Sequence, residues 1–303
     1  MMLLVDVGTN AEIILGNRGR VVAASSPTGP AFEGAEISSG QRAAPGAIER
    51  VRIDPQTLEP RYRIIGVEQW SDAPGFEEAA GAVGVTGICG SAIIEVVAEM
   101  YLTGIISEDG VIDGTLSARS SRIHQQGRTF SYLLREGTPR ITVTQTDVRA
   151  IQLAKAALYA GIRLLMEKQG VARVDMIRLA GAFGSFIDPK YAMVLGLIPD
   201  CPLDEVRAVG NAAGTGALMA LLNRGHRREI EAEVRRIEKI ETALEPHFQQ
   251  LFIDAMALPN KVDRFPELAK AVALPPRKTA EAGDASPVSR RRSREDRAAR
   301  RRE

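Results

Sequence analysis

The chain of 303 residues carries 39 Lys plus Arg and 38 Asp plus Glu, a net charge of +1, with 45% apolar and 25% charged residues, as in ordinary globular proteins. This near-neutral charge argues against a dedicated nucleic-acid binder, and two cysteines, Cys89 and Cys201, are too few for a disulfide framework or an iron-sulfur cluster. The longest uncharged stretches, Ala79–Ile94 and Ala208–Asn223, are too short and too glycine-rich to span a membrane. Because the sequence also shows no signal-peptide pattern, we expect a cytoplasmic protein.

The first third of the sequence predicts mainly β-strands. Leu3–Val7 is a continuous apolar run, typical of a central strand that is buried on both faces. Turn residues separate two further strands, Ala11–Leu15 and Arg20–Ala24. We expect short strands within Ile48–Gln69, and apolar residues at helical spacing predict a helix over Ile88–Leu102.

The second half alternates strands and helices after a segment, 105–140, that we expect to be loop-rich. The expected elements are the strand Ile141–Thr144, a helix from Thr146 to Gly170, the strand Asp175–Leu179, a helix opened by Asp188 and Pro189, the strand Val206–Val209, a helix through Leu222 and a charged helix Arg227–Glu245. Three antiparallel strands followed by alternating helices and strands follow the ribonuclease-H-like plan of actin-type and sugar-kinase-type ATPase domains. The predicted fold is therefore an α/β mixed sheet flanked by helices, with loop-rich insertions.

The predicted domain covers residues 1–258, with insertions near 35–80 and 103–142, and residues 259–303 read as an extended segment with a basic tail. Ser289–Glu303 holds eight arginines against three acidic residues. Such a composition cannot bury enough apolar surface to offset its ordering entropy, so we expect a disordered tail. Weak contact of the tail with RNA or an acidic partner is the alternative.

A glycine turn after the first strand is the first candidate site. Asp6 stands at the carboxyl end of that strand, and Gly8 permits a backbone whose amides form an anion-binding concavity. Thr9 and Asn10 add side-chain donors. Because Asp6 and phosphate are both negative, Asp6 would act indirectly, holding hydrated Mg²⁺ or a water beside the phosphates. A plain hairpin turn with a capped Asp explains the same residues equally simply.

Two further glycine turns also follow predicted strands. Gly181 and Gly184 would let a nucleotide lie against bare backbone at the carboxyl end of the sheet, where ligands of open α/β sheets collect. A tight β-to-α turn is the alternative. Gly210, Asn211 and Gly214, at a helix start, could approach a ligand or could only allow close packing of the helix on the sheet.

Glu33 lies among turn-forming residues, where it could orient an attacking water or contact Mg²⁺, although a surface glutamate fits equally well. Other chemistries lack their motifs. The sequence has no Gly-Lys dipeptide for a P-loop and no Gly-x-Ser-x-Gly elbow, and its three histidines make no metal spacing. Cys89 precedes a predicted helix, but its apolar setting favours a buried structural thiol.

Taken together, these motifs resemble a known family. Six blocks occur in order: Leu4–Ile13, Gly29–Ala35, Gly87–Ser91, Leu153–Ala157, Leu179–Gly184 and Val209–Gly214. This series is similar to the C-terminal ATPase region of the reductive activators of corrinoid proteins, within the ASKHA superfamily of acetate and sugar kinases, heat-shock proteins and actin. The resemblance runs from about Met2 to about Pro266 and leaves out the tail.

The resemblance implies an ATPase that helps to drive an uphill electron transfer, in which an iron-sulfur domain reduces the Co(II) corrinoid of a methyl-transfer protein to Co(I). It implies ATP and Mg²⁺ as cofactors, and a ferredoxin-type electron donor domain and a corrinoid protein as partners. The implied second phosphate loop comprises Asp6, Gly8, Thr9 and Asn10, and the implied adenosine contacts are Gly181 and Gly184, joined less securely by Gly210, Asn211 and Gly214.

Departures from the family leave other functions open. Family members also carry a ferredoxin domain with four cluster cysteines and a first ATPase half with its own phosphate loop, neither of which this sequence contains, and Ala92 stands where the family typically has Gly. The chain thus resembles the second lobe of a two-lobed ATPase and is expected to be incomplete alone. One alternative is a non-catalytic nucleotide-binding or dimerisation module, as a truncated gene product would be, and the other is a lobe of a small-molecule kinase. A homodimer is a further possible assembly.

Overall fold

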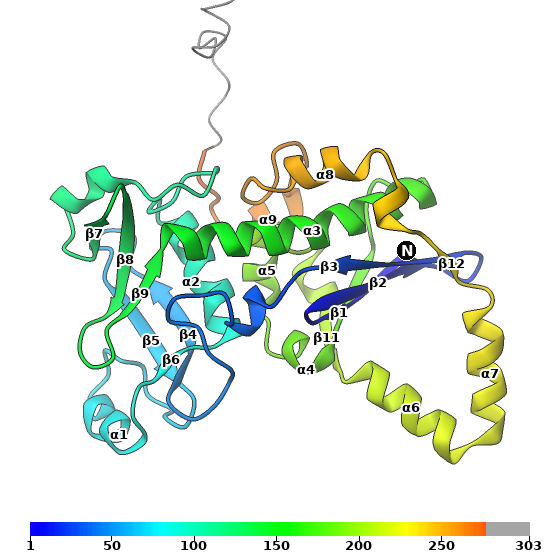
Figure 1. Cartoon of the computed structure of the whole chain (residues 1–303), viewed down its shortest axis with the longest axis horizontal. Helices are drawn as coiled ribbons and strands as arrows, with labels where there is room; N and C mark the ends of the chain where they lie inside the picture. Colours follow the sequence, from blue (N-terminus) through cyan, green and yellow to red (C-terminus); the bar gives the residue numbers. More distant parts are fainter. Residues whose placement is uncertain (277–303) are drawn as a thin grey trace, which may run out of the picture.

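The computed structural model of the chain describes residues 1–276 and is built around one six-stranded sheet (Figure 1). In spatial order its strands are β11 (Val206–Gly210), β10 (Met176–Ala180), β1 (Met2–Val7), β2 (Asn10–Gly16), β3 (Val21–Pro27) and β12 (Glu238–Lys239). Strands β1, β2 and β3 are antiparallel, whereas β10 runs parallel to β1 and β11 runs parallel to β10. This order confirms the predicted mixed sheet.

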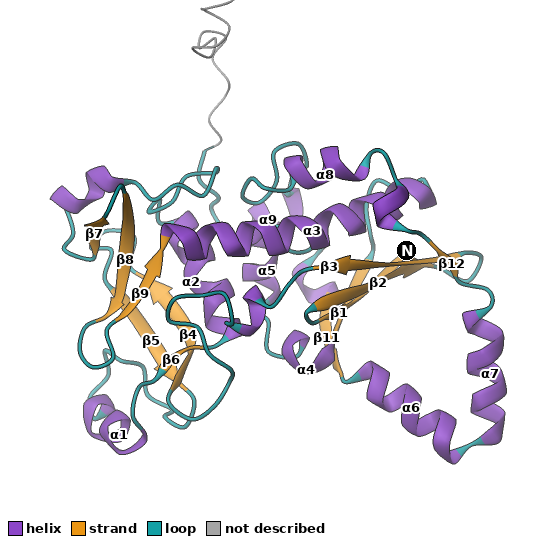
Figure 2. Cartoon of the chain, viewed as in Figure 1, coloured by secondary structure: helices purple, strands orange, loops and turns teal. Residues whose placement is uncertain are grey.

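Helix α3 (Gln145–Gln169) covers one face of the sheet (Figure 2). It begins with a capping box, in which the Thr144 side chain accepts from the backbone of Asp147 and the Asp147 side chain accepts from the backbone of Thr144. A Cβ at Gly161 would lie 2.7 Å from Cδ1 of Ile13, so this glycine lets the helix approach β2 closely. Alternate residues of β1, β2 and β3 are buried beneath α3 and form the core.

On the opposite side, α6 (Ala212–Leu222) and α7 (Arg224–Val234) form an arch that stands away from the sheet (Figure 2). The expected charged helix Arg227–Glu245 was too long at its carboxyl end, because the chain turns after Val234 and then forms β12 beside β3. Ile240 continues the helical spacing, but it is buried and its amide donates to the carbonyl of Ala23 at 2.8 Å.

A second region packs against the amino-terminal end of α3. It contains two three-stranded sheets, β5-β4-β6 and β7-β8-β9, and two helices. The bounds are β4 (Ala47–Ile53), β5 (Pro60–Ile64), α1 (Phe76–Val83), β6 (Gly87–Ile88), α2 (Gly90–Leu102), β7 (Ile123–Gln126), β8 (Thr129–Arg135) and β9 (Ile141–Thr144). The expectation of a loop-rich segment 105–140 was therefore wrong for the hairpin β7–β8, whose Tyr132 is buried and donates its hydroxyl to the carbonyl of Leu58.

A buried charge network joins α2 to β4. The carboxylate of Glu95 on α2 accepts from Arg50 at 2.8 Å, from Arg52 at 2.6 Å and from the amide of Val51 at 2.9 Å. The Glu95 side chain is only 1% exposed, so these three donors replace the water that the carboxylate loses on folding. The network therefore fixes the orientation of α2 against the β5-β4-β6 sheet.

The carboxyl-terminal segment returns along α3 and α5 (Pro189–Leu195), which begins after the N-cap Asp188 as expected. Residues 248–254 form α8 (Phe248–Asp254), and 266–271 form α9 (Pro266–Ala271) within the segment that we expected to be extended. The predicted basic tail Ser289–Glu303 lies outside the described residues. Within residues 1–276, no helix is both long and apolar enough to cross a membrane.

Lys155 on α3 anchors this segment. Its side chain is fully buried, and its Nζ donates to the backbone carbonyls of Ala257 and Pro259. Burial lowers the pKa of Lys155 well below the usual lysine value, because the charged form loses its water.

Candidate functional site

The sheet brings the three predicted glycine turns to one edge. Asp6 at the end of β1 pairs in register with Ala180 of β10, and Ala180 pairs with Gly210 of β11. These three residues form a row across the carboxyl ends of neighbouring parallel strands. The two turns that follow β10 and β11 therefore begin beside Asp6, as expected for ligand sites in open α/β sheets.

Asp6 and Gly181 are in direct contact. Gly181 has a φ of +88°, and a Cβ at this position would lie 2.4 Å from Oδ1 of Asp6. Both the backbone conformation and the space therefore require glycine. Among residues 1–276 the half-exposed carboxylate of Asp6 forms no hydrogen bond or ion pair, which leaves its oxygens available to a ligand.

The loop between β1 and β2 is fixed by its neighbours. The hydroxyl of Thr28 donates to the carbonyl oxygen of Gly8 at 2.6 Å and also contacts that of Thr9 at 3.0 Å. The hydroxyl of Thr9 in turn donates to Oε1 of Glu33 at 2.6 Å. The structure thus joins two residues that the sequence placed in separate motifs, and it adds Thr28, which sequence reasoning missed because a lone threonine after a strand carries no signal.

The turns after β10 and β11 differ in what holds them. Residues 181–184 form the four-residue helix α4 (Gly181–Gly184), and a Cβ at Gly184 would meet ordinary van der Waals contacts, so space does not require glycine there. Asn211 caps α6, since its Oδ1 accepts from the amide of Gly214 at 2.7 Å. This cap explains the Asn-x-x-Gly spacing without a ligand. Gly210, in contrast, lies at the carboxyl end of β11, in the row with Asp6 and Ala180.

An apolar cavity of about 440 Å³ adjoins Glu33. It is lined by Phe32, Phe183 and Phe186 and by the start of α2, and the rings of Phe32 and Phe183 are stacked with centroids 6.2 Å apart. A Cβ at Gly90 would lie 2.3 Å from the Phe183 ring, which explains the glycine that precedes Ser91. Sequence reasoning missed these aromatic walls, although the glycine-rich run around Cys89 was a signal of close packing.

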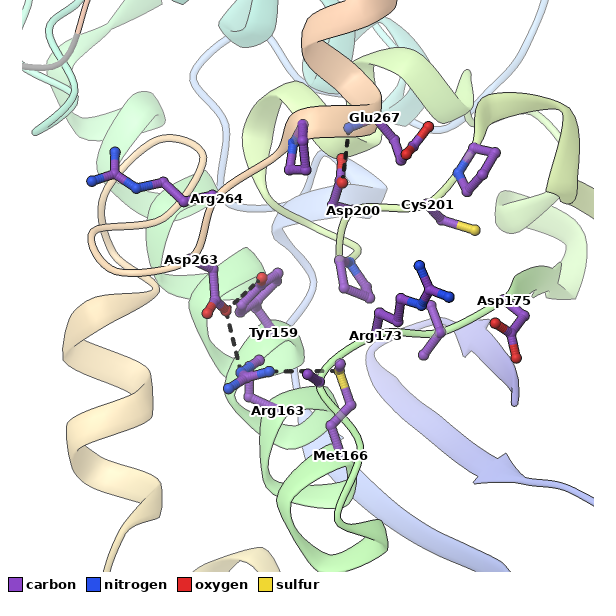
Figure 3. Close-up of a pocket in the computed structure, with 15 residues that line it drawn as sticks. Tyr159, Arg163, Met166, Arg173, Asp175, Asp200, Cys201, Asp263, Arg264 and Glu267 are labelled. Carbon is purple, nitrogen blue, oxygen red and sulfur yellow. Dashed lines mark hydrogen bonds and ion pairs between the residues drawn. The ribbon is translucent and has the colours of Figure 1, made fainter.

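A second cavity, of about 500 Å³, lies at the other end of the sheet, near the residues that precede β1 and β10 (Figure 3). Some of its polar groups are engaged with one another: Asp263 accepts from the Tyr159 hydroxyl at 2.8 Å and pairs with Arg163 at 3.2 Å. Asp200 accepts from the amide of Glu267 at 2.9 Å at the start of α9. These contacts hold the carboxyl-terminal segment in place.

Both cysteines are free and buried, which confirms the interpretation of Cys89 as a buried thiol. Burial raises the pKa of the Cys201 thiol to about 11, which keeps it protonated and unreactive at neutral pH. Within residues 1–276, no three His, Cys, Asp or Glu side chains are grouped to hold a metal ion. A Mg²⁺ at Asp6 would therefore need most of its oxygen ligands from water and phosphate, as Mg²⁺ sites in nucleotide-binding proteins commonly do.

Comparison with known proteins identifies relatives of this chain. Residues 1–269 match the family model described as the C-terminal domain of RACo, the ASKHA domain. The chain is 35% identical over 265 residues to the corrinoid activation enzyme RamQ of Eubacterium limosum, covering 84% of this chain and 42% of RamQ. It is 31% identical over 212 residues to the [Co(II) methylated amine-specific corrinoid protein] reductase of Methanosarcina barkeri, covering 65% of this chain and 34% of that protein.

A solved structure shows the same fold. The reductive activator for corrinoid, iron-sulfur protein superposes with a TM-score of 0.73 at 32% identity, covering 86% of this chain and 40% of that chain. The chain thus spans about two fifths of the length of RamQ and of this activator.

Proposed function

This chain belongs to the family of the C-terminal ASKHA domain of RACo, and we propose that it forms one lobe of an ATPase that drives the reductive activation of a corrinoid protein. The names of its relatives describe corrinoid activation and reduction of a Co(II) corrinoid protein. Because the chain matches only about two fifths of RamQ, the proposal assigns it the nucleotide-binding part of that activity.

The contact between Asp6 and Gly181 carries the proposal. It joins a carboxylate that has no hydrogen-bond or ion-pair partner within residues 1–276 to a bare stretch of backbone at the carboxyl ends of two parallel strands. A carboxylate in that position suits water-mediated Mg²⁺ binding, and the bare backbone suits close approach of a nucleotide. When bound, MgATP would supply the phosphoanhydride bond whose hydrolysis offsets the uphill reduction of Co(II) to Co(I).

Within this lobe we assign the phosphate contacts to the loop of Gly8, Thr9 and Asn10. Thr28 fixes that loop by its bonds to two carbonyl oxygens, and the Thr9 hydroxyl donates to Glu33, so the backbone amides of the loop are the donors positioned before the ligand arrives. Gly181 and Gly184 are assigned to the adenosine side. Gly210 would border the same site, while Asn211 and Gly214 would shape its rim through the cap of α6.

Glu33 is assigned to the attacking water. Its Oε1 accepts from the hydroxyl of Thr9, which holds the carboxylate beside the phosphate loop. Its second oxygen can then accept a proton from water as the water attacks the terminal phosphate. The apolar cavity next to Glu33 lowers the local density of water, which favours one ordered nucleophile over bulk solvent.

The other half of the ATPase site and the electron donor would come from outside this lobe. Phosphoryl transfer needs charge neutralisation around the whole γ-phosphate, and this lobe offers one side of it. We therefore propose that another lobe closes over the nucleotide, and that a ferredoxin-type domain donates the electron to the corrinoid protein.

The experiment joins this chain to the part of RamQ that lies outside the match, in place of RamQ's own matched part. Reduction of a Co(II) corrinoid protein is followed by its visible absorption with and without MgATP. We expect ATP-dependent reduction by the chimera and its loss in the Asp6→Asn chimera, because the amide cannot hold hydrated Mg²⁺ as the carboxylate does.

Asp72→Asn is the matched control, since Asp72 is exposed and lies in a distant loop with only a long ion pair to Arg61, 3.8 Å. It should leave the rate unchanged. The proposal fails if the chimera hydrolyses ATP no faster than the RamQ part alone, or if Asp6→Asn and Asp72→Asn behave alike.

A further inference from the structure

The apolar cavity beside Glu33 carries one charged side chain that the site described above does not use. Three charged residues line this cavity, namely Glu33, Arg42 and Glu49. Glu33 accepts from the hydroxyl of Thr9, and Glu49 pairs with Arg63 at 3.0 Å. Among the residues that the structure describes, the exposed Arg42 forms neither a hydrogen bond nor an ion pair. Its guanidinium group is therefore the charge in this wall that an anionic ligand can meet.

The backbone holds Arg42 beside the turn that carries Glu33. The amide of Gln41, the residue before Arg42, donates to the carbonyl of Ile88 at 2.9 Å. Gly34 directly follows Glu33 and crosses this segment so closely that a Cβ at Gly34 would lie 2.6 Å from the amide nitrogen of Gln41. Two segments in contact therefore bring Glu33 and Arg42 to the same cavity, while the exposed side chain of Arg42 stays free to turn toward a ligand.

A nucleotide at this edge of the sheet would bring its phosphates next to two carboxylates. Asp6 lies against Gly181, and Glu33 lies against Thr9 of the phosphate loop. Repulsion between these like charges opposes binding unless positive groups offset it. Hydrated Mg²⁺ held by Asp6 would offset the charge on one side, and the side with Glu33 needs a second positive group. A guanidinium suits this place because it is always charged and its N–H groups can donate to two phosphate oxygens at once.

We propose that Arg42 binds the terminal phosphate of ATP and makes this lobe favour ATP over ADP. The inference rests on the proposed function, since the terminal phosphate is the one attacked by the water assigned to Glu33. Because Arg42 lines the same cavity as Glu33, its long side chain reaches the phosphate that this water attacks. The guanidinium then stabilises the charge on the phosphate oxygens in the ground state and during phosphoryl transfer.

Titrations of the full chain with MgATP and with MgADP test this, with the affinities taken from the amide chemical shifts of Gly8 and Gly181. Arg42→Met removes the charge and keeps an unbranched side chain. We expect it to weaken MgATP binding about tenfold, as for the loss of one charge-assisted contact, and MgADP binding less than about twofold. Arg42→Lys keeps the charge but loses the forked donor geometry, so it should weaken MgATP binding about threefold.

Arg128→Met is the matched control. Arg128 is exposed in the turn between β7 and β8, a hairpin that is not part of the cavity wall, so its substitution should leave both affinities unchanged. All three variants change exposed side chains and should stay folded, which unchanged amide shifts in α3 would verify.

Two results would overturn the role of Arg42 and leave the proposed function standing. One is equal weakening of MgATP and MgADP binding by Arg42→Met, which would place the guanidinium away from the terminal phosphate. The other is an unchanged affinity for MgATP in that variant. A wild-type chain whose Gly8 and Gly181 amides respond to neither nucleotide would instead contradict the proposed function itself, and the role of Arg42 with it.

Discussion

At Gly181, a hydrogen atom stands where any other residue would place a Cβ 2.4 Å from the carboxylate of Asp6. Gly181→Ala should therefore lower the free energy of unfolding by about 1–3 kcal/mol, through strain at positive φ and displacement of Asp6. Gly184→Ala is the matched control within the same helix, and it should be neutral or stabilise by up to roughly 1 kcal/mol. Thermal unfolding of the two variants measures both changes in stability. Equal changes would show that the site does not require glycine at position 181.

Lys155 provides a test that depends on pH. Burial lowers its pKa well below 10.5, so below 10.5 the unfolded chain binds a proton more readily than the folded chain does. The free energy of unfolding of the wild type should then rise with pH as pH approaches 10.5, by up to about 1.4 kcal/mol per pH unit from this group. Lys155→Met removes this contribution and leaves the carbonyls of Ala257 and Pro259 without their donor.

The measurement is chemical denaturation of the wild type and Lys155→Met from neutral pH to about pH 10. The wild type should gain stability relative to the variant as the pH rises. Other groups that titrate cancel in this difference, so a difference that stays constant with pH would show that Lys155 keeps an ordinary pKa.

Single residues of the site were predictable where a motif marked them. Asp6 and Gly181 were predicted to share one edge of the sheet, and the register of β1 with β10 places them there. The contact of Thr9 with Glu33 was not predictable, because it depends on how a loop after β3 folds back over the first turn. Asn211 could have been read as a helix cap from its spacing to Gly214.

At the scale of elements, the charge network between α2 and β4 gives the sharpest prediction. Glu95→Ala should lower the free energy of unfolding by about 3–5 kcal/mol, because it leaves Arg50 and Arg52 without their buried partner. Glu59→Ala breaks the pair with Arg122, in which the Glu59 side chain is 51% exposed, and should cost under about 1 kcal/mol. Urea unfolding of both variants measures the contrast, and similar losses would contradict a structural role for burial of Glu95.

Elements with a strong apolar period were predicted well, and elements without one were not. The apolar stripe of α3 followed from spacing and is confirmed, whereas its start was expected at Thr146 and lies slightly earlier, because Thr144 caps a helix that begins at Gln145. Strand β7 was missed because Ile123–Gln126 has one buried side chain and two exposed glutamines, which gives no alternating pattern. Helix α7 was overextended because Ile237 and Ile240 keep the helical period while tertiary pairing of β12 with β3 ends the helix.

For the whole molecule, the proposed division of the ATPase into lobes predicts little activity from this chain alone. Asp6 is half-exposed, and Thr9 and Asn10 beside it are exposed, so water would screen the contacts that stabilise the transition state. We expect steady-state ATP hydrolysis by the purified chain to be at background. Robust turnover that Asp6→Ala abolishes would show that this lobe carries a complete site.

Amide chemical shifts show directly where MgATP binds, even when binding is weak. Titration of the labelled chain with MgATP should shift the amides of Gly8, Thr9, Gly181 and Gly184, and Asp6→Asn should remove those shifts. The amide chemical shifts of Arg163 and Asp263, in the cavity at the opposite end of the sheet, should not change. Shifts confined to that cavity, or none at the four residues beside Asp6, would show that MgATP does not bind at the carboxyl ends of β1 and β10.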